Sequence, residues 1–186
     1  MIVIVHGYEG SGPGHWQRWL EEELRQRGEP VLFPDLPDPL EPQCDRWVEA
    51  LAQCVAGAAT PVTFVAHSLG CWAVDHFLAR YGSRRVHGAL LVAPPSPYLL
   101  FEAIQSFLPP PQRADAWQPI APHSLLVGSD NDPYIEAREL EELSHRLGIR
   151  LHVLPGSGHI NLESGFGPWP FALDWLAREG ALRSHR

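Results

Sequence analysis

A serine stands where an apolar run meets a helix-forming segment, in the motif Ala66-His67-Ser68-Leu69-Gly70. The run Val62–Ala66 is typical of a buried strand, and the residues after it have helical spacing. A sharp strand-to-helix turn of this kind presents a nucleophilic serine, with small residues two before and two after it; here Ala66 replaces the usual first glycine. We therefore interpret Ser68 as a nucleophile. The alternative is that its hydroxyl only caps the following helix.

An attacking serine needs a base and an acid, which in this arrangement follow in the order serine, acid, histidine. An apolar run leads into Asp130 and Asp132, and the next run, Leu151–Leu154, leads through a glycine-rich turn to His159. The order and context of these residues predict a triad of Ser68, Asp132 and His159.

Two acids compete for the middle position of this triad. Asp132 precedes Pro133, whose fixed φ stiffens the chain where a carboxylate must be held against an imidazole. We favour Asp132 as the triad acid and interpret Asp130 as a loop-stabilising carboxylate.

The oxyanion that forms during such an attack needs two backbone N–H donors. The residue after the nucleophile supplies one, here Leu69. The second comes from the loop after an early strand, and we assign it to the Tyr8 N–H, just after His6-Gly7. The glycines of this loop do not match a phosphate-binding motif, because G-x-G-x-x-G is absent and no lysine follows.

Four aromatic residues are candidates for contacts with an apolar part of a substrate. They follow the first loop, lie in the helix after the serine, or come just after the histidine: Trp16, Trp72, Phe166 and Trp169. Core packing is the alternative for each of them.

Composition excludes several classes of function. The 186 residues carry a net charge of −8 and their 14 basic residues are all Arg, so binding to nucleic acid or to a membrane is not expected, and lysine chemistry is excluded. The histidines and three cysteines lack metal-ligand spacing, so no metal and no cofactor is expected. The cysteines are too sparse for a disulfide framework and no signal peptide or membrane span is apparent, which favours a cytoplasmic protein.

The elements that must position these residues alternate between strands and helices. This alternation predicts an α/β fold, a three-layer α/β/α sandwich with a mainly parallel sheet of about six strands. Residues 1–186 are expected to form one domain, with a helix at Leu99–Leu108 and a small lid as the candidate role of 94–122. Strands buried on both faces are expected at Ile2–Val5, Val31–Phe33, Val62–Ala66, Ala89–Val92 and Leu125–Val127, with a sixth at Leu151–Leu154.

The sequence resembles the small α/β-hydrolase serine hydrolases typified by bacterial YdeN and the human retinoblastoma-binding serine hydrolase. The resemblance runs nearly end to end. It implies Ser68 as nucleophile, Asp132 as acid and His159 as base, on a reduced hydrolase fold without a large cap. The residues that carry it are His6-Gly7, Gly14-His15-Trp16-Gln17, Ala66-His67-Ser68-Leu69-Gly70, Asp130-Asn131-Asp132-Pro133-Tyr134, Gly158-His159-Ile160-Asn161 and Gly165-Phe166-Gly167-Pro168-Trp169-Pro170.

The leading functional hypothesis is a serine hydrolase that cleaves a small carboxylic ester, or else an amide or thioester, at an open and shallow site. The alternatives are a non-catalytic binding or regulatory protein on the same fold, and an acyltransferase with the same triad. The only partner expected is a small-molecule substrate. A retinoblastoma-type partner is not expected, since Leu69-Gly70-Cys71-Trp72-Ala73 lacks the glutamate of L-x-C-x-E.

Overall fold

The structure is a computed structural model that describes residues 1–183. Within this range the protein is built on one sheet of six parallel strands. The strand order is β2-β1-β3-β4-β5-β6, with every neighbouring pair parallel. The strands are β1 (Ile2–Val5), β2 (Val31–Leu32), β3 (Val62–His67), β4 (Val86–Val92), β5 (Leu125–Ser129) and β6 (Arg150–Leu154).

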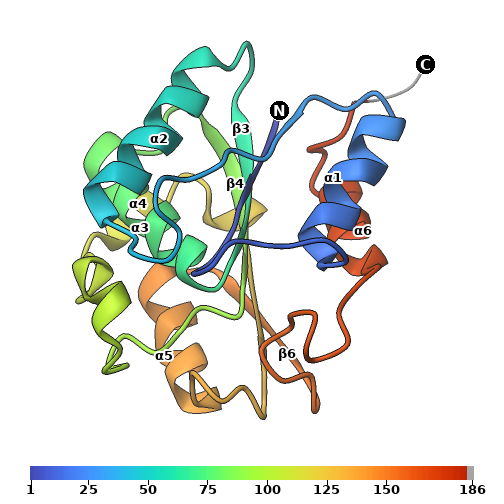
Figure 1. Cartoon of the computed structure of the whole chain (residues 1–186). Helices are drawn as coiled ribbons and strands as arrows, with labels where there is room; N and C mark the ends of the chain where they lie inside the picture. Colours follow the sequence, from blue (N-terminus) through green and yellow to red (C-terminus); the bar gives the residue numbers. More distant parts are fainter. Residues whose placement is uncertain (184–186) are drawn as a thin grey trace.

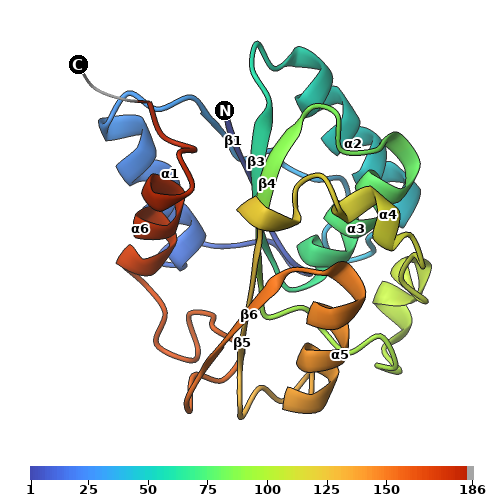
Figure 2. The same cartoon turned by 180° about the vertical axis from the view of Figure 1, so that it is seen from behind.

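Helices cover both faces of the sheet, as Figures 1 and 2 show from opposite sides. Helices α1 (Trp16–Gln26) and α6 (Pro170–Arg178) lie on one face. The other face carries α2 (Cys44–Gly57), α3 (Leu69–Tyr81), α5 (Ala137–Leu147) and the short α4 (Ala114–Trp117). The fold is therefore the three-layer α/β arrangement that the alternation of elements predicts.

The side chains of β1 explain why the chain forms two cores. Val3 and Val5 belong to the core under α2 and α3, whereas Ile2 and Ile4 belong to the core under α1 and α6. Successive side chains of a strand point to opposite faces, so a strand covered by helices on both sides must be apolar throughout. All four side chains are fully buried.

The two strands at the edges of the sheet depart from this expectation. Strand β2 ends at Leu32 rather than Phe33, and Leu32 is exposed. Although Leu151–Leu154 was expected to be buried on both faces, Arg150, His152 and Val153 of β6 are exposed. The reason is position, because β6 pairs only with β5 and forms one edge of the sheet. Charged and polar side chains on an edge strand discourage pairing with another chain.

The segment between β4 and β5 differs from the single helix expected at Leu99–Leu108. It forms a 3₁₀ turn, η1 (Glu102–Phe107), then α4, then a second 3₁₀ turn, η2 (Ala121–His123). Four of its side chains pack into the core beside α2 and α3, so most of it is an integral layer: Ile104, Phe107, Trp117 and Ile120.

Because all strands are parallel, their carboxyl ends lie along one edge of the sheet. The loops that leave this carboxyl edge comprise residues 6–15, 33–43, 93–108, 130–136 and 155–169, and we call them the carboxyl-edge loops. After residue 108 the chain runs toward the opposite side of the sheet, where the amino ends of the strands lie. There Arg146, in the last turn of α5, donates to the Pro111 carbonyl over 2.6 Å. No described helix is long and apolar enough to cross a bilayer.

Candidate active site

Ser68 occupies a strained turn between β3 and α3. Its φ of 52° and ψ of −125° are unusual for a residue with a side chain. Such strain persists where surrounding structure enforces it, and it is typical of functional positions. The serine is partly exposed, while the residues on either side of it are buried. The turn thus presents one hydroxyl at the carboxyl edge.

Glycine at position 70 is required by the close approach of β1. A Cβ there would lie 2.6 Å from the His6 carbonyl oxygen and 2.7 Å from that of Val5. Both neighbours are backbone atoms and cannot rotate away. The small residue two places after the serine is therefore explained by direct contact between the turn and the end of β1.

The first loop passes directly beside the nucleophile. A Cβ on Gly7 would lie 2.8 Å from the Ser68 Cβ, so only glycine fits there. The next amide, that of Tyr8, has no hydrogen-bond partner within residues 1–183. Leu69 is the first residue of α3, where a backbone N–H has no intrahelical acceptor. Of the two predicted oxyanion donors, the Leu69 amide thus has no intrahelical acceptor, and the Tyr8 amide follows the glycine that packs against Ser68.

The predicted base and acid form a continuous hydrogen-bonded chain with the serine. Ser68 Oγ lies 2.9 Å from His159 Nε2, and His159 Nδ1 lies 2.9 Å from Asp132 Oδ2 and 3.1 Å from Oδ1. Asp132 and His159 are buried, at 8% and 7% exposure. An acceptor carboxylate fixes the proton on Nδ1, which leaves Nε2 free to accept the serine proton.

Asp130 has a different task. Its Oδ1 accepts the Gly156 N–H over 2.7 Å, and Asn131 Oδ1 accepts the Gly158 N–H over 2.7 Å. These contacts join the loop after β5 to the loop after β6, three residues and one residue before His159. The structure therefore places Asp132 against the imidazole and Asp130 between the two loops.

Buried side chains of β3 and α1 hold the backbone of the loop that carries His159. His67 Nε2 lies 3.0 Å from the His159 carbonyl oxygen, and the Trp16 indole N–H donates to the Ile160 carbonyl over 2.9 Å. The His159 N–H donates to Ser164 Oγ over 3.1 Å. Burial keeps the pKa of His67 well below its usual range, as does the nearby imidazole of His159.

Gln17 is a supporting residue that sequence reasoning missed. Its fully buried amide donates to the carbonyls of Val5 and Val65 over 3.0 and 3.3 Å, and it accepts the Ser11 hydroxyl over 2.7 Å. It thereby joins the first loop to the ends of β1 and β3. Its position in the sequence gives only a weak signal. Gln17 lies beside the apolar stripe of a helix, where a polar side chain is ordinarily expected to be exposed.

The four predicted aromatic contacts lie mainly inside the protein. Trp16 and Trp72 are buried, and their indole N–H groups donate to the Ile160 and Pro95 carbonyls, so neither ring is available at the surface. Trp169 is 9% exposed and packs on Trp16 and Phe166. Phe166 is partly exposed. Burial follows because Trp16 and Trp72 lie on helices that cover the sheet, and Trp169 immediately precedes a third such helix, α6.

Different aromatic side chains flank the triad. The Tyr134 ring contacts the His159 imidazole edge-on, with centroids 4.7 Å apart, and is 46% exposed. Tyr8 contacts Phe101 in the same manner at 5.0 Å. Tyr134 was visible in the sequence as part of the Asp-Pro-Tyr motif, but a solvent-facing role for Phe101 had no local signal.

Other chemistries find no support in residues 1–183. No group of three or more histidine, cysteine and acidic side chains is arranged to hold a metal ion within this range. Cys71, three residues after the nucleophile, donates to the Val92 carbonyl, and burial raises the pKa of its thiol. It is a packed side chain behind the turn rather than a second nucleophile.

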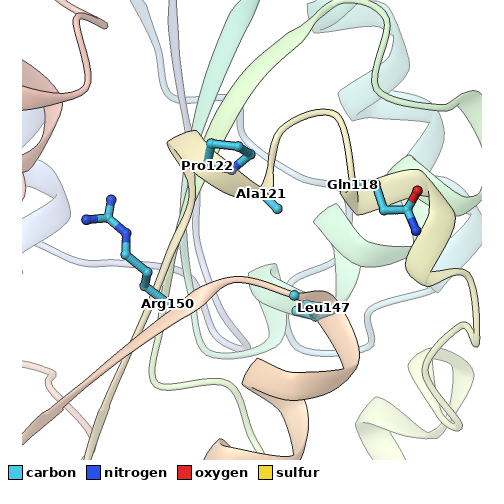
Figure 3. Close-up of a pocket in the computed structure, with 6 residues that line it drawn as sticks. Gln118, Ala121, Pro122, Leu147 and Arg150 are labelled. Carbon is cyan, nitrogen blue, oxygen red and sulfur yellow. The ribbon is translucent and has the colours of Figure 1, made fainter.

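A hollow of about 360 Å³ lies at the opposite edge of the sheet from Ser68 (Figure 3). It is bounded by the amino ends of β5 and β6 and by the end of α5: Gln118, Ala121, Pro122, Leu147, Gly148 and Arg150. A second hollow, of about 400 Å³, is lined by residues of α2 and by Pro37. Neither is lined by a triad residue.

Similarity to known proteins covers nearly the whole chain. The YdeN protein of Bacillus subtilis (strain 168) is 25% identical over 181 residues, 94% of this chain and 93% of YdeN. The crystal structure of the ydeN product superposes with a TM-score of 0.84 at 26% identity, covering 97% of this chain and 98% of that one. A YdeN-like protein of Pectobacterium atrosepticum gives 0.75 at 27% identity, covering 97% and 90%.

More distant structures share the fold alone. Est1E of Butyrivibrio proteoclasticus superposes with a TM-score of 0.68 at 15% identity, covering 97% of this chain and 85% of that one.

The model of the serine hydrolase family matches residues 2–178, from the first strand to the last helix. The chain belongs to the serine hydrolase family.

Proposed function

We propose that this protein hydrolyses small carboxylic esters through an acyl-enzyme formed on Ser68. The observation that carries the proposal is the hydrogen-bonded chain from Ser68 Oγ through His159 to Asp132, at 2.9 Å for each link. A partly exposed serine hydroxyl beside an oriented neutral imidazole has what nucleophilic catalysis requires.

The reaction follows from the positions of these groups. Ser68 Oγ attacks the ester carbonyl carbon while His159 Nε2 takes the hydroxyl proton. The Leu69 and Tyr8 N–H groups stabilise the resulting oxyanion. His159 then donates that proton to the leaving alcohol, and the carbon–oxygen bond to the alcohol breaks. His159 then deprotonates a water molecule, which attacks the carbonyl carbon of the acyl-enzyme. His159 returns this proton to Ser68 Oγ as the bond between Oγ and the acyl carbon breaks, and the carboxylic acid is released.

Asp132 stabilises the imidazolium that exists between these steps. Its carboxylate accepts a hydrogen bond from the Nδ1–H group of His159, and its Oδ1 accepts a second one from the Tyr134 N–H over 2.9 Å. Pro133 separates the two residues and limits the conformations of that turn. The acid is thus held by its own loop.

Fluorophosphonate labelling tests whether Ser68 is an activated nucleophile. We expect the wild-type protein to be labelled and Ser68→Ala to remain unlabelled, with loss of ester turnover in the same variant. Ser83→Ala, which removes a serine beyond the other end of α3, is the matched control and should behave as wild type. Equal labelling of the Ser68 variant and the wild type would contradict the proposal.

Product analysis distinguishes hydrolysis from the alternatives. Turnover of an ester in the presence of added alcohols or amines should yield the free acid as the main product. A transferred acyl product in excess would indicate an acyltransferase with the same triad. A folded protein that neither reacts with the probe nor turns over any ester, amide or thioester would indicate a binding protein.

We further propose a cytoplasmic location. Three free cysteines support it, two buried and one partly buried, since this set forms no disulfide.

A further inference from the structure

The exposed apolar side chains of this protein gather at the carboxyl edge. Among residues 1–183, nine large hydrophobic residues are exposed, and six of them lie on carboxyl-edge loops that come from four different strands. We call these six the apolar rim: Leu40, Tyr98, Leu100, Phe101, Tyr134 and Leu162. A concentration of exposed apolar surface around a reactive group marks a binding surface.

Two members of the apolar rim touch the proposed machinery. Tyr134 lies edge-on against the His159 ring at 4.7 Å. Phe101 lies 5.0 Å from the ring of Tyr8, whose neighbour Gly7 packs against Ser68. Because His159 must hand its proton to the leaving group, that group has to sit beside the imidazole, next to Tyr134.

The same loops contain neither arginine nor lysine. None of the 14 arginines falls within the carboxyl-edge loops, all of which lie in the described part of the chain, and the protein has no lysine. Nine of the 22 acidic residues do fall there, Asp132 among them. The other thirteen acidic residues nearly balance the arginines, so the net charge of −8 belongs almost entirely to this edge.

The arginines at the start of the flanking helices offset only one of these nine charges, that of Asp38. Arg18 pairs with Glu21 at 3.2 Å, Arg138 pairs with Glu142 at 2.9 Å, and Arg46 pairs with Asp38 of a carboxyl-edge loop. A carboxylate or phosphate on a substrate would therefore find no free cationic partner here. It would also meet repulsion that acts over about 8 Å at physiological ionic strength.

From these two observations we infer the substrate class, which is an acyl compound with an apolar leaving group and no negative charge. Among substrates that do carry a charge, a positively charged one is preferred over an anionic one. This inference rests on the proposed function, because it assigns the substrate of the Ser68 site. It excludes phosphate-bearing thioesters and esters of dicarboxylic acids as the preferred substrates.

Three esters that differ only in charge test the inference. They share one acyl group and carry a leaving alcohol that ends in trimethylammonium, in the neutral isostere tert-butyl, or in carboxylate. At about 20 mM salt we expect kcat/KM for the cationic ester to exceed that for the anionic ester about tenfold, and the ratio to shrink at about 500 mM. An anionic ester that is turned over as well as the cationic one at low salt would overturn the inference.

Matched charge variants locate the effect on the carboxyl edge. Glu9→Gln, Glu102→Gln and Glu163→Gln together remove three exposed charges from three carboxyl-edge loops and should lower the cation-to-anion ratio two- to threefold. The control combines Glu22→Gln, Glu141→Gln and Asp174→Asn, which remove three exposed charges from helices and should leave the ratio unchanged. Equal effects of both sets would also overturn the inference.

A pair of tyrosines tests the apolar contact. Tyr134→Ala should lower kcat/KM for an ester of a bulky apolar alcohol about tenfold more than for a methyl ester. The control is Tyr81→Ala, because the Tyr81 side chain is exposed to a similar extent, 48% against 46% for Tyr134. This variant should leave the selectivity unchanged. If Tyr134→Ala instead dissociates a dimer without changing selectivity, the apolar rim binds a second copy and the inference fails.

Failure of this inference is distinguishable from failure of the proposed function. If Ser68-dependent turnover occurs with a flat charge preference, only the substrate class is wrong. If no ester is turned over, labelling rates of Ser68 by cationic and anionic phosphonate probes give the same comparison. Absence of any Ser68 labelling contradicts both proposals.

Discussion

The imidazole of His67 donates a hydrogen bond from Nε2 to the backbone carbonyl of His159 over 3.0 Å. The carbonyl can only accept, so the proton must be on Nε2. The residue that precedes Ser68 thereby holds the backbone of His159. The distance between Ser68 and His159 is set from two directions, by this contact and by the triad itself.

We expect His67→Phe to lower kcat about 10- to 100-fold with little change in KM. The phenyl ring can replace the imidazole in its packing on Trp16, but it cannot hold the His159 carbonyl, and small misplacement of a base is costly. His67→Gln, whose amide can reach the same carbonyl, should restore part of the rate. Equal losses in the two variants, or a change confined to KM, would contradict a positioning role.

Exchange of the two loop aspartates should separate their roles. Asp132→Asn is expected to lower kcat about 10³- to 10⁴-fold, because an amide cannot orient the imidazole or stabilise its charge as a carboxylate does. Asp130→Asn should cost less than about threefold, since an amide oxygen can still accept the Gly156 N–H. Steady-state kinetics on both variants give the answer, and an inactive Asp130→Asn beside an active Asp132→Asn would reverse the assignment.

Two glycine substitutions should have opposite effects on stability. Gly70→Ala places a methyl group against the His6 and Val5 carbonyls, which should lower the free energy of unfolding by about 3 kcal/mol. Gly57→Ala, in α2 with nothing within 4 Å, should raise it by about 0.5 kcal/mol. Thermal unfolding measures both; an unchanged midpoint for Gly70→Ala would show that β1 can retreat.

Acid should destabilise the fold through His15. Burial lowers the pKa of this histidine to about 4, with further lowering by His159 and Arg18, and its Nδ1 accepts the Gln17 N–H at the start of α1. Between about pH 6.5 and pH 4, His15 is protonated in the unfolded chain but not in the folded one. The free energy of unfolding therefore decreases as the pH is lowered through this range. The loss from pH 7 to 5 is about 2 kcal/mol for this group.

His15→Asn is the matched test, because asparagine also caps a helix but does not titrate. Denaturant unfolding at pH 7 and pH 5 should show a smaller pH dependence in the variant than in the wild type. His67 and His6, whose pKa values burial also lowers, should preserve part of the slope. An identical pH dependence in both proteins would exclude His15 as a contributor.

Local patterns in the sequence predict most of the strands and the order of the site residues. Strand β1 matches its apolar run at Ile2–Val5, and the motif around Ser68 forms the expected turn. β-Branched apolar side chains favour the strand locally. The small residues of the turn are also visible in the sequence, although the need for glycine at position 70 comes from the close approach of β1. The 3₁₀ turn at Glu102–Phe107 was not predicted, because its conformation follows from packing against α3 rather than from helical spacing.

Residue type and chain order alone predict the parallel α/β fold and identify Ser68, Asp132 and His159 as a candidate triad. Only the tertiary structure decided which aromatic side chains face solvent, that Gln17 and His67 brace the site, and that the net negative charge lies on one edge. The physical reason is that these properties depend on contacts between segments far apart in the chain, such as Tyr134 with His159 and His67 with the same residue. Burial and neighbourhood are set by how the layers pack, and no local pattern of residues records them.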